Sequence, residues 1–202
     1  DWSSDVCSSD LFVVGKLHDQ LRVPYGMNVV MNPLATLDLA VATGASFIRS
    51  AFTGTYAGDA GFYEPDPATV IRRKYHLNAQ NVKMFFKVNP ESDSYIGERT
   101  YQSITSSIIN RCAPDALCVS GTEAGTETDS NFIKEIVSYA KGVPVICNTG
   151  CNAANVLDKL SCCDGACVGS AFKKDGKTEN TVDPARVKEF MDIVKAYRDT
   201  IN

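Results

Sequence analysis

The sequence lacks the features that would assign it to several special classes of protein. No apolar run approaches the ~20 residues that a membrane-spanning helix needs. The 20 Lys and Arg residues do not outnumber the 24 Asp and Glu residues and form no basic cluster, which argues against a nucleic-acid-binding protein. The first residues lack the basic and apolar regions of a signal peptide. With 44% hydrophobic and 22% charged residues, the 202-residue chain has the composition of a globular protein with its own core.

Sequence motifs for common cofactors are missing as well. There is no GxGxxG or Walker A loop, which weakens the case for a nucleotide-binding sheet. The eight cysteines contain no CxxC pair, and neither His18 nor His76 lies near the cysteine-rich stretch 147–167, so we expect no zinc site. Cys118 and Cys147 lie in apolar runs, where cysteine behaves as a small hydrophobe. These features favour a reduced, cytoplasmic chain, and they predict no particular cofactor or metal.

The first eleven residues differ in character from the rest. The segment DWSSDVCSSDL, residues 1–11, has neither helical nor strand periodicity and is similar to a translated sequencing-adaptor sequence. The alternative is a genuine polar tail. We therefore predict a non-native tail over residues 1–11, disordered or unpacked, and a single domain over residues 12–202.

From Phe12 onward, apolar strands alternate with helices. A proline starts the helix expected over Pro33–Ala45, Asp129 or Ser130 caps a second helix, and Asp183-Pro184 begins the last one. The strands are apolar on both faces, which is typical of parallel strands covered by helices. Six strands are expected, over residues 26–32, 47–52, 82–88, 115–121, 144–150 and 165–170.

Two α/β folds produce this alternation, an open doubly wound sheet and a (β/α)₈ TIM barrel. Polar residues directly after the strands favour the barrel, whose active face is built from those positions. A barrel needs eight strands, so six indicate an incomplete barrel containing about strands 3 to 8. The first and last of these six strands should then each lack a neighbour on one side, and the missing strands would belong to a longer native chain.

The ends of the last two strands predict a phosphate site. They finish in NTG and VGS, and in barrels the loops after strands seven and eight commonly hold a phosphate. Lysines in the segment 173–177 add positive charge nearby. The alternative is that the glycines only turn the chain and the lysines are solvated. The predicted phosphate-binding residues are Asn148, Thr149, Gly150, Gly169 and Ser170.

Charged residues inside strands are the next candidates. Arg49 lies within FIRSAF, where a guanidinium is costly unless paired, so we expect it to be largely buried with a carboxylate or carbonyl partner or facing an anionic substrate. Lys83 and Lys87 share one face of VKMFFKV and either form a Schiff base or pair with carboxylates. Other polar residues expected to line the site are Asn28, Asn32, Ser120 and Thr122.

Three longer motifs carry a resemblance to a known family. The stretch DALCVSG with AGTETD, then NTG-x₄-NV and FKKDGKTEN-x-VDPARV, resembles the BtpA/SgcQ family over about Val14 to Arg198. The segment from Pro24 to Glu64 is closest to the SgcQ branch. The resemblance implies a barrel of the ribulose-phosphate-binding type. It also adds Tyr56 to the lining residues and Asp59 to Arg49, Lys83 and Lys87 as catalytic candidates, although Lys87 departs from the family pattern.

These observations together predict the function and the partners. We expect a phosphorylated sugar or similar anionic metabolite to bind at the C-terminal face of the barrel, with isomerase, epimerase or lyase chemistry. The resemblance also implies two alternatives, a non-catalytic factor for photosystem I assembly or stability and a nucleoside triphosphatase. A small phosphorylated metabolite is the expected partner, with no nucleic acid and no membrane span, and a homo-oligomer remains open.

Overall fold

The computed structural model describes residues 2–58 and 61–201. The chain forms two compact units. Unit 1 consists of Asp1–Lys87, Asp93–Glu98 and Ser107–Ala116. Unit 2 consists of Val88–Ser92, Arg99–Ser106 and Leu117–Asn202.

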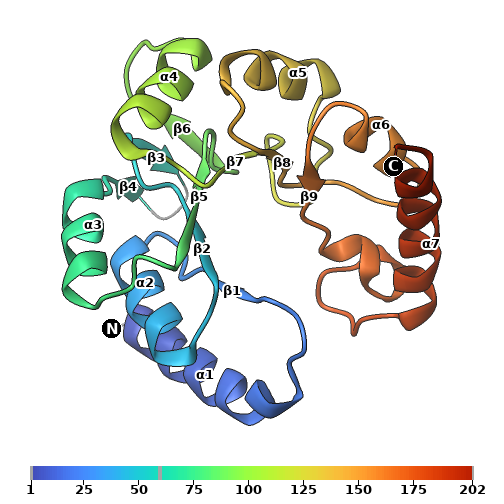
Figure 1. Cartoon of the computed structure of the whole chain (residues 1–202), viewed down its shortest axis with the longest axis horizontal. Coiled ribbons are helices and arrows are strands. Elements are labelled where there is room, and N and C mark those ends of the chain that lie inside the picture. The colour runs from blue at the N-terminus through green and yellow to red at the C-terminus, as the bar shows by residue number, and fades with distance from the viewer. Residues whose placement is uncertain (1, 59–60, 202) are drawn as a thin grey trace. The chain divides into compact units, whose positions relative to one another are not determined.

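The chain contains a six-stranded parallel sheet (Figure 1). Its strand order β1-β2-β5-β7-β8-β9 follows the chain, as in a (β/α) barrel, and a helix or a helical segment precedes each new strand. The six expected strands are therefore confirmed, together with the α/β class and the incomplete TIM-barrel fold. Among the described residues, β1 and β9 are the edge strands, as expected. The strands are Gly26–Met27 (β1), Phe47–Ser50 (β2), Lys83–Lys87 (β5), Ala116–Val119 (β7), Val145–Cys147 (β8) and Gly165–Ala166 (β9).

Several of these strands are shorter than expected, and β1 shows why. The prediction extended it to Asn32, but the N–H of Asn32 donates to the carbonyl of Val29 in a turn, and Met31 has a positive φ of 57°. The side chain of Asn32 then caps helix α2, Pro33–Thr43, by accepting a hydrogen bond from the N–H of Ala35. The strand ends early because its last residues begin the helix.

Unit 1 contains three of the parallel strands and a second, antiparallel sheet. That sheet has the order β4-β3-β6 and is built from Tyr56–Gly58 (β3), Gly61–Tyr63 (β4) and Asp93–Tyr95 (β6). Strands β3 and β4 lie in the long connection that follows β2, which contains no long apolar run, and β6 follows β5. Helix α2 and helix α3, Pro67–His76, belong to the same unit.

The expectation of a disordered N-terminal segment is wrong for the described residues. Trp2–Leu17 form helix α1, which contacts α2 in unit 1 (Figure 1). The helix therefore includes the described part of the polar segment 1–11. The side chains of Leu11, Phe12 and Val13 are exposed, so the helix buries little apolar surface there. The non-native origin of residues 1–11 stays a prediction.

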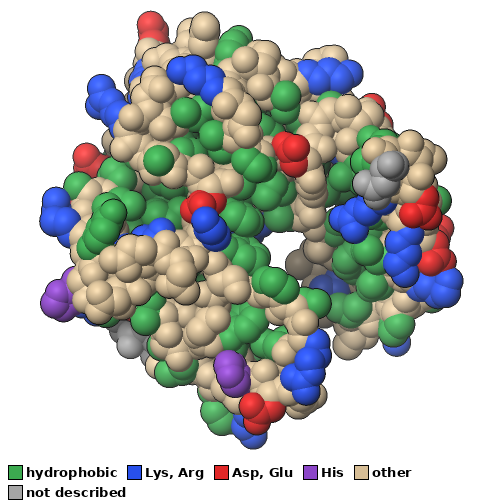
Figure 2. All heavy atoms as spheres, viewed as in Figure 1, with side chains coloured by type: hydrophobic (Ala, Val, Ile, Leu, Met, Phe, Trp, Pro, Cys, Tyr) green, Lys and Arg blue, Asp and Glu red, His purple; other side chains and the backbone are tan. Residues whose placement is uncertain are grey.

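Unit 2 contains β7, β8 and β9 with their helices. Helix α5, Ser130–Tyr139, is capped by Asp129, whose carboxylate accepts from the N–H of Phe132, as expected. Helix α6, Val156–Leu160, contacts β9 and the last helix α7, Pro184–Ile201 (Figure 1). Short 3₁₀ turns, Ser170–Phe172 (η2) and Lys174–Gly176 (η3), lie between β9 and α7. Over α7, Lys and Arg side chains alternate with Asp and Glu side chains (Figure 2), and Lys188 pairs with Asp192 there.

Helix α4, Tyr101–Cys112, includes residues of both units, and a 3₁₀ turn, His18–Gln20 (η1), follows α1. None of the helices in the described ranges combines the length and apolar character needed to cross a membrane.

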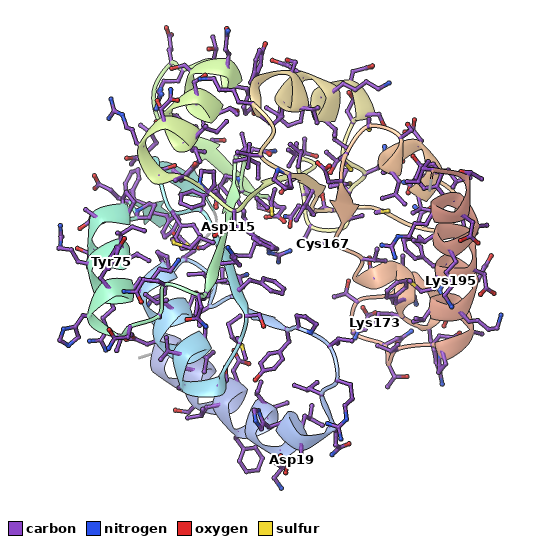
Figure 3. All side chains as sticks on the ribbon, in the orientation of Figure 1. Asp19, Tyr75, Asp115, Cys167, Lys173 and Lys195 are labelled. Carbon is purple, nitrogen blue, oxygen red and sulfur yellow. The ribbon has the colours of Figure 1, made fainter. Side chains whose placement is uncertain are left out.

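Two aspartates at strand starts tie neighbouring strands together. Asp115 precedes β7, and its carboxylate accepts from the N–H of Met84 at 2.8 Å and pairs with Lys83 at 2.8 Å (Figure 3). Asp164 precedes β9 and accepts from the N–H of Val145 at 2.8 Å in the same manner. Each carboxylate extends the pairing of two parallel strands by one hydrogen bond.

We expect Asp115→Ala to lower the free energy of unfolding by about 2 kcal/mol at pH 7, because a half-buried N–H and an ammonium lose a charged acceptor. Burial raises the pKa of Asp115, but the hydrogen bonds from Lys83 and Met84 outweigh it and lower the pKa below 3.8. The stabilisation is therefore complete well above pH 3.8 and is lost as the pH falls through the folded-state pKa. Urea unfolding at pH 7 and pH 3 measures this, with exposed Asp19→Ala as the control. Equal effects of the two substitutions at pH 7 would contradict the prediction.

Candidate functional site

Polar side chains meet at the carboxyl ends of the strands in unit 2. Asn89 follows β5, and its amide both accepts from the N–H of Ser120 at 3.0 Å and donates to the carbonyl of Ser120 at 2.8 Å. Ser120 follows β7 and is 2% exposed. Its hydroxyl accepts from the amide of Asn148, which follows β8, at 2.9 Å. The expected convergence of Ser120 and Asn148 is present, and Asn89 fixes their backbone.

A carboxylate completes this polar network. The amide nitrogen of Asn148 also donates a hydrogen bond to Oε1 of Glu91, and the two atoms lie 2.6 Å apart. Glu91 is half-buried, whereas Asn148 is 5% exposed. Within the part of the chain that is described, the proton of the Ser120 hydroxyl has no acceptor. The network therefore holds a carboxylate and a hydroxyl donor at one edge of the sheet.

Two of the predicted phosphate-binding residues, Thr149 and Gly150, make close contacts with the loop after β7. The hydroxyl of Thr149 accepts from the N–H of Gly121 at 2.7 Å and contacts the hydroxyl of Thr128 at 3.3 Å. Gly150 has a φ of 70°, and a Cβ there would lie 2.3 Å from the Cα of Glu127. Both residues attach the end of β8 to the loop after β7. This packing accounts for a threonine and a glycine at these positions, and an anion contact through their backbone N–H groups stays a prediction.

The residues after β9 are more exposed than those after β8. Because β8 and β9 are parallel neighbours, Gly169 and Ser170 follow β9 at the same edge of the sheet as Asn148. Gly169 is exposed, and a Cβ added there meets no atom within 4 Å. Among the hydrogen bonds of the described residues, the backbone N–H groups of Gly169 and Ser170 donate to none. These two groups are therefore available to an anion.

Positive charge accompanies this stretch. Lys173 follows closely, and its N–H donates to the carbonyl of Ser170 at 2.9 Å (Figure 3). The guanidinium of Arg186, on α7, donates to the carbonyl of Ala171 at 2.8 Å. Both cationic residues are half-buried. Arg186 escaped the sequence analysis as a site residue, although it lies in the motif VDPARV.

A buried lysine holds the neighbouring loop. Lys159 on α6 is 1% exposed, and its ammonium lies 2.6 Å from Oε1 of Glu127, 2.8 Å from the hydroxyl of Ser130 and 3.4 Å from Asp158. Burial lowers the pKa of Lys159, but the bond and charge of Glu127 outweigh burial and raise it. The Lys159 hydrogen bond also lowers the pKa of Glu127. This protonated lysine is a structural tie between α6 and the loop after β7.

In unit 1, three predicted lining residues have different outcomes. Asn32 caps α2 with its side-chain oxygen, so we no longer assign it to a site. Tyr56 is 2% exposed, and its ring packs against the rings of Tyr63 and Tyr95 from the neighbouring strands of the antiparallel sheet. It is therefore a core residue. Asn28, after β1, is half-buried, and its role stays a prediction.

Of the four predicted catalytic residues, the structure does not bring the three that it describes together at one site. Lys83 begins β5, and its ammonium pairs with Asp115 at the amino ends of the strands, which is the wrong edge for the expected site. Arg49 is half-buried in β2 rather than largely buried, and Lys87, at the end of β5, is half-buried as well. Asp59 lies outside the described residues. Thr122, in unit 2, is exposed and accepts from the N–H of Ser92 through its carbonyl only.

The cysteines carry no sign of reactive chemistry. All eight are free thiols, and burial raises the pKa of Cys147 to about 11 and that of Cys151 to about 12. At the end of β9, the N–H of Cys167 donates to the carbonyl of Cys147 in the ladder with β8 (Figure 3). In the described ranges, no three or more His, Cys, Asp or Glu side chains are grouped so as to hold a metal ion.

The fold and the strand-end site define a (β/α)-barrel protein with a polar cluster at its carboxyl edge. A solved structure described as "Native KDPGal structure" matches with a TM-score of 0.55 and 15% identity over 96% of this chain and 76% of that chain. A designed, cube-shaped porous protein cage matches with a TM-score of 0.53 and 16% identity over 95% and 57% of the two chains. At these identities the likeness shows the TIM-barrel fold alone.

The chain belongs to the BtpA family, whose model matches residues 3–196. Escherichia coli SgcQ, an sgc region protein, is 43% identical over 92% of this chain and 69% of its own length. The photosystem I biogenesis protein BtpA of Synechocystis is 26% identical over 94% of this chain and 66% of its own length. The chain thus spans about two thirds of each of these relatives. The family resemblance seen in the sequence motifs is confirmed.

Proposed function

We propose that this chain binds a phosphorylated sugar or a similar anionic metabolite at the carboxyl edge of the sheet in unit 2. The observation that carries the proposal is the combination of two features at that edge. Glu91, Ser120 and Asn148 form a network that suits the hydroxyl groups of a sugar. Gly169 and Ser170 offer free N–H groups beside Lys173 and Arg186, which suits an anion.

The proposed chemistry is that of an isomerase, epimerase or lyase. Active sites of this fold are built from residues at the carboxyl ends of strands, and the polar network lies there. A carboxylate and a hydroxyl donor together can catalyse proton transfer. The carboxylate takes the proton, and the hydroxyl stabilises the negative charge that develops on the substrate. The cell compartment proposed is the cytoplasm, in keeping with eight free thiols.

Gly169 provides the sharpest test of the anion site. We expect Gly169→Asp to weaken binding of a phosphorylated sugar at least tenfold, because it places a negative charge beside the two free N–H groups. A side chain fits there without a clash, so the variant should fold normally. Calorimetric titration with inorganic phosphate and with four- to six-carbon aldose and ketose phosphates measures the affinities.

Gly169→Ala is the matched control, since it adds a Cβ without charge and should bind like the wild type. Equal affinities of the Asp and Ala variants would contradict the anion site. Absence of binding by the wild-type chain to every compound would contradict the proposed function and favour the assembly role for which the Synechocystis relative is named.

A further inference from the structure

Glu91 is held in place by its neighbours on both sides. Asn89 clamps the backbone of Ser120 with two side-chain hydrogen bonds. Ser92 donates its N–H to the carbonyl of Thr122 at 3.1 Å. The residue between these anchors therefore projects from a segment that is attached twice to the end of β7.

The backbone beside Glu91 is strained. Ser92 has a φ of 61°, in the left-handed region that residues with a side chain seldom adopt. Such strain persists where surrounding contacts impose it, and it concentrates at active sites. Here the N–H of Ser92 is hydrogen-bonded to the carbonyl of Thr122, so the backbone next to Glu91 is anchored.

Asn148 orients that carboxylate. Its amide donates at 2.6 Å to Oε1 of Glu91 and at 2.9 Å to the Ser120 hydroxyl, so one buried group fixes both polar partners. Other carboxylates of unit 2 near this edge have different surroundings: Glu127 is neutralised by Lys159, and Glu123 is exposed on the loop after β7. Glu91 shares the amide of Asn148 with the strand-end hydroxyl of Ser120, which places its carboxylate within the polar network.

We propose that Glu91 is a catalytic acid–base residue that moves a proton at a carbon next to the carbonyl of the sugar, and that Asn148 is its positioning residue. This inference rests on the proposed function. The Glu91 carboxylate takes the proton from the carbon, and the electron pair of the broken C–H bond forms a C=C bond as the carbonyl electrons move onto oxygen. The Ser120 hydroxyl donates a hydrogen bond to this oxygen. The Glu91 carboxylic acid then returns a proton to carbon, so no oxidant or reductant is consumed.

Deuterium exchange tests the step without knowledge of the final product. The full chain is incubated in D₂O with ribulose 5-phosphate and with other four- to six-carbon ketose and aldose phosphates, and proton NMR follows the loss of C–H signals. We expect the wild type to exchange one C–H next to the carbonyl of at least one compound. Glu91→Gln should slow this exchange at least a hundredfold, measured at ligand concentrations that saturate each variant. Glu123→Gln, an exposed carboxylate of the same unit, should exchange like the wild type.

The positioning role has its own measurement. Loss of the amide donors in Asn148→Ala should raise the pKa of the catalytic carboxyl, so the acid limb of the exchange rate should move to higher pH. An unchanged acid limb would contradict that role.

The outcomes separate the two proposals. Tight binding with no exchange by the wild type, or undiminished exchange by Glu91→Gln, would overturn the catalytic role and leave the binding proposal intact. A wild type that binds none of the compounds would overturn both.

Discussion

Gly150→Ala is expected to lower the free energy of unfolding by about 3 kcal/mol. A Cβ at this position would lie 2.3 Å from the Cα of Glu127 and 2.4 Å from the carbonyl oxygen of Thr126, so backbone must move to admit it. The φ of 70° adds left-handed strain of about 1 kcal/mol, and forced repacking of a close contact costs a further 1–3 kcal/mol or so. Urea unfolding at pH 7 measures the loss.

Gly142→Ala separates these two costs. Gly142 has a similar positive φ of 85°, but a Cβ there meets no atom within 4 Å. Its alanine variant should lose only the strain energy, about 1 kcal/mol. Equal losses in the two variants would show that the loop after β7 does not press on Gly150, and the packing explanation for the NTG motif would be wrong.

Lys159→Ala is expected to cost about 3 kcal/mol. The substitution leaves a cavity where a fully buried side chain lay and removes hydrogen bonds to Glu127 and Ser130. Lys159→Met keeps most of the volume and should cost less. Exposed Lys195→Ala on α7 (Figure 3) is the control and should change the free energy of unfolding by less than about 0.5 kcal/mol.

The pH dependence of this loss follows from two shifted groups. The pKa of Glu127 is lowered below 4.5, so its share of the stabilisation is present above that pH and is lost in acid. The pKa of Lys159 is raised above 10.5, so its share is present below that pH and is lost as the pH rises through the folded-state pKa. The difference between wild type and Lys159→Ala should therefore be constant from pH 6 to pH 9. A difference that vanished within this range would contradict the ion pair.

Local patterns were sufficient to predict the main elements of the fold. Pro33 and Gly44 bound α2 as helix-start and helix-end residues should, and Asp129 caps α5. These signals act over a few residues and depend little on the rest of the chain. The six apolar strands were predictable for the same reason, whereas the short strands β3, β4 and β6 follow no long apolar run and were missed.

The candidate site was predictable only in part. Ser120 and Asn148 follow buried strands, and the parallel topology brings such positions to one edge. Glu91 and Arg186 lie beyond the strand ends, and their places depend on hydrogen bonds to residues far away in the sequence. Lys83 was assigned to the site from its residue type, but its position at the start of β5 puts it at the opposite edge, beside Asp115. A charged residue in a strand is thus informative only once its place along the strand is known.

The most direct test of the binding site is a two-dimensional ¹H–¹⁵N NMR titration of the full chain with ribulose 5-phosphate and, separately, with inorganic phosphate. We predict that the largest shifts for both ligands occur at the amides of Gly169 and Ser170, and that the sugar phosphate alone also shifts Ser120 and Gly121. Absence of shifts at these residues, or shifts confined to distant positions such as Gly142, would contradict this prediction.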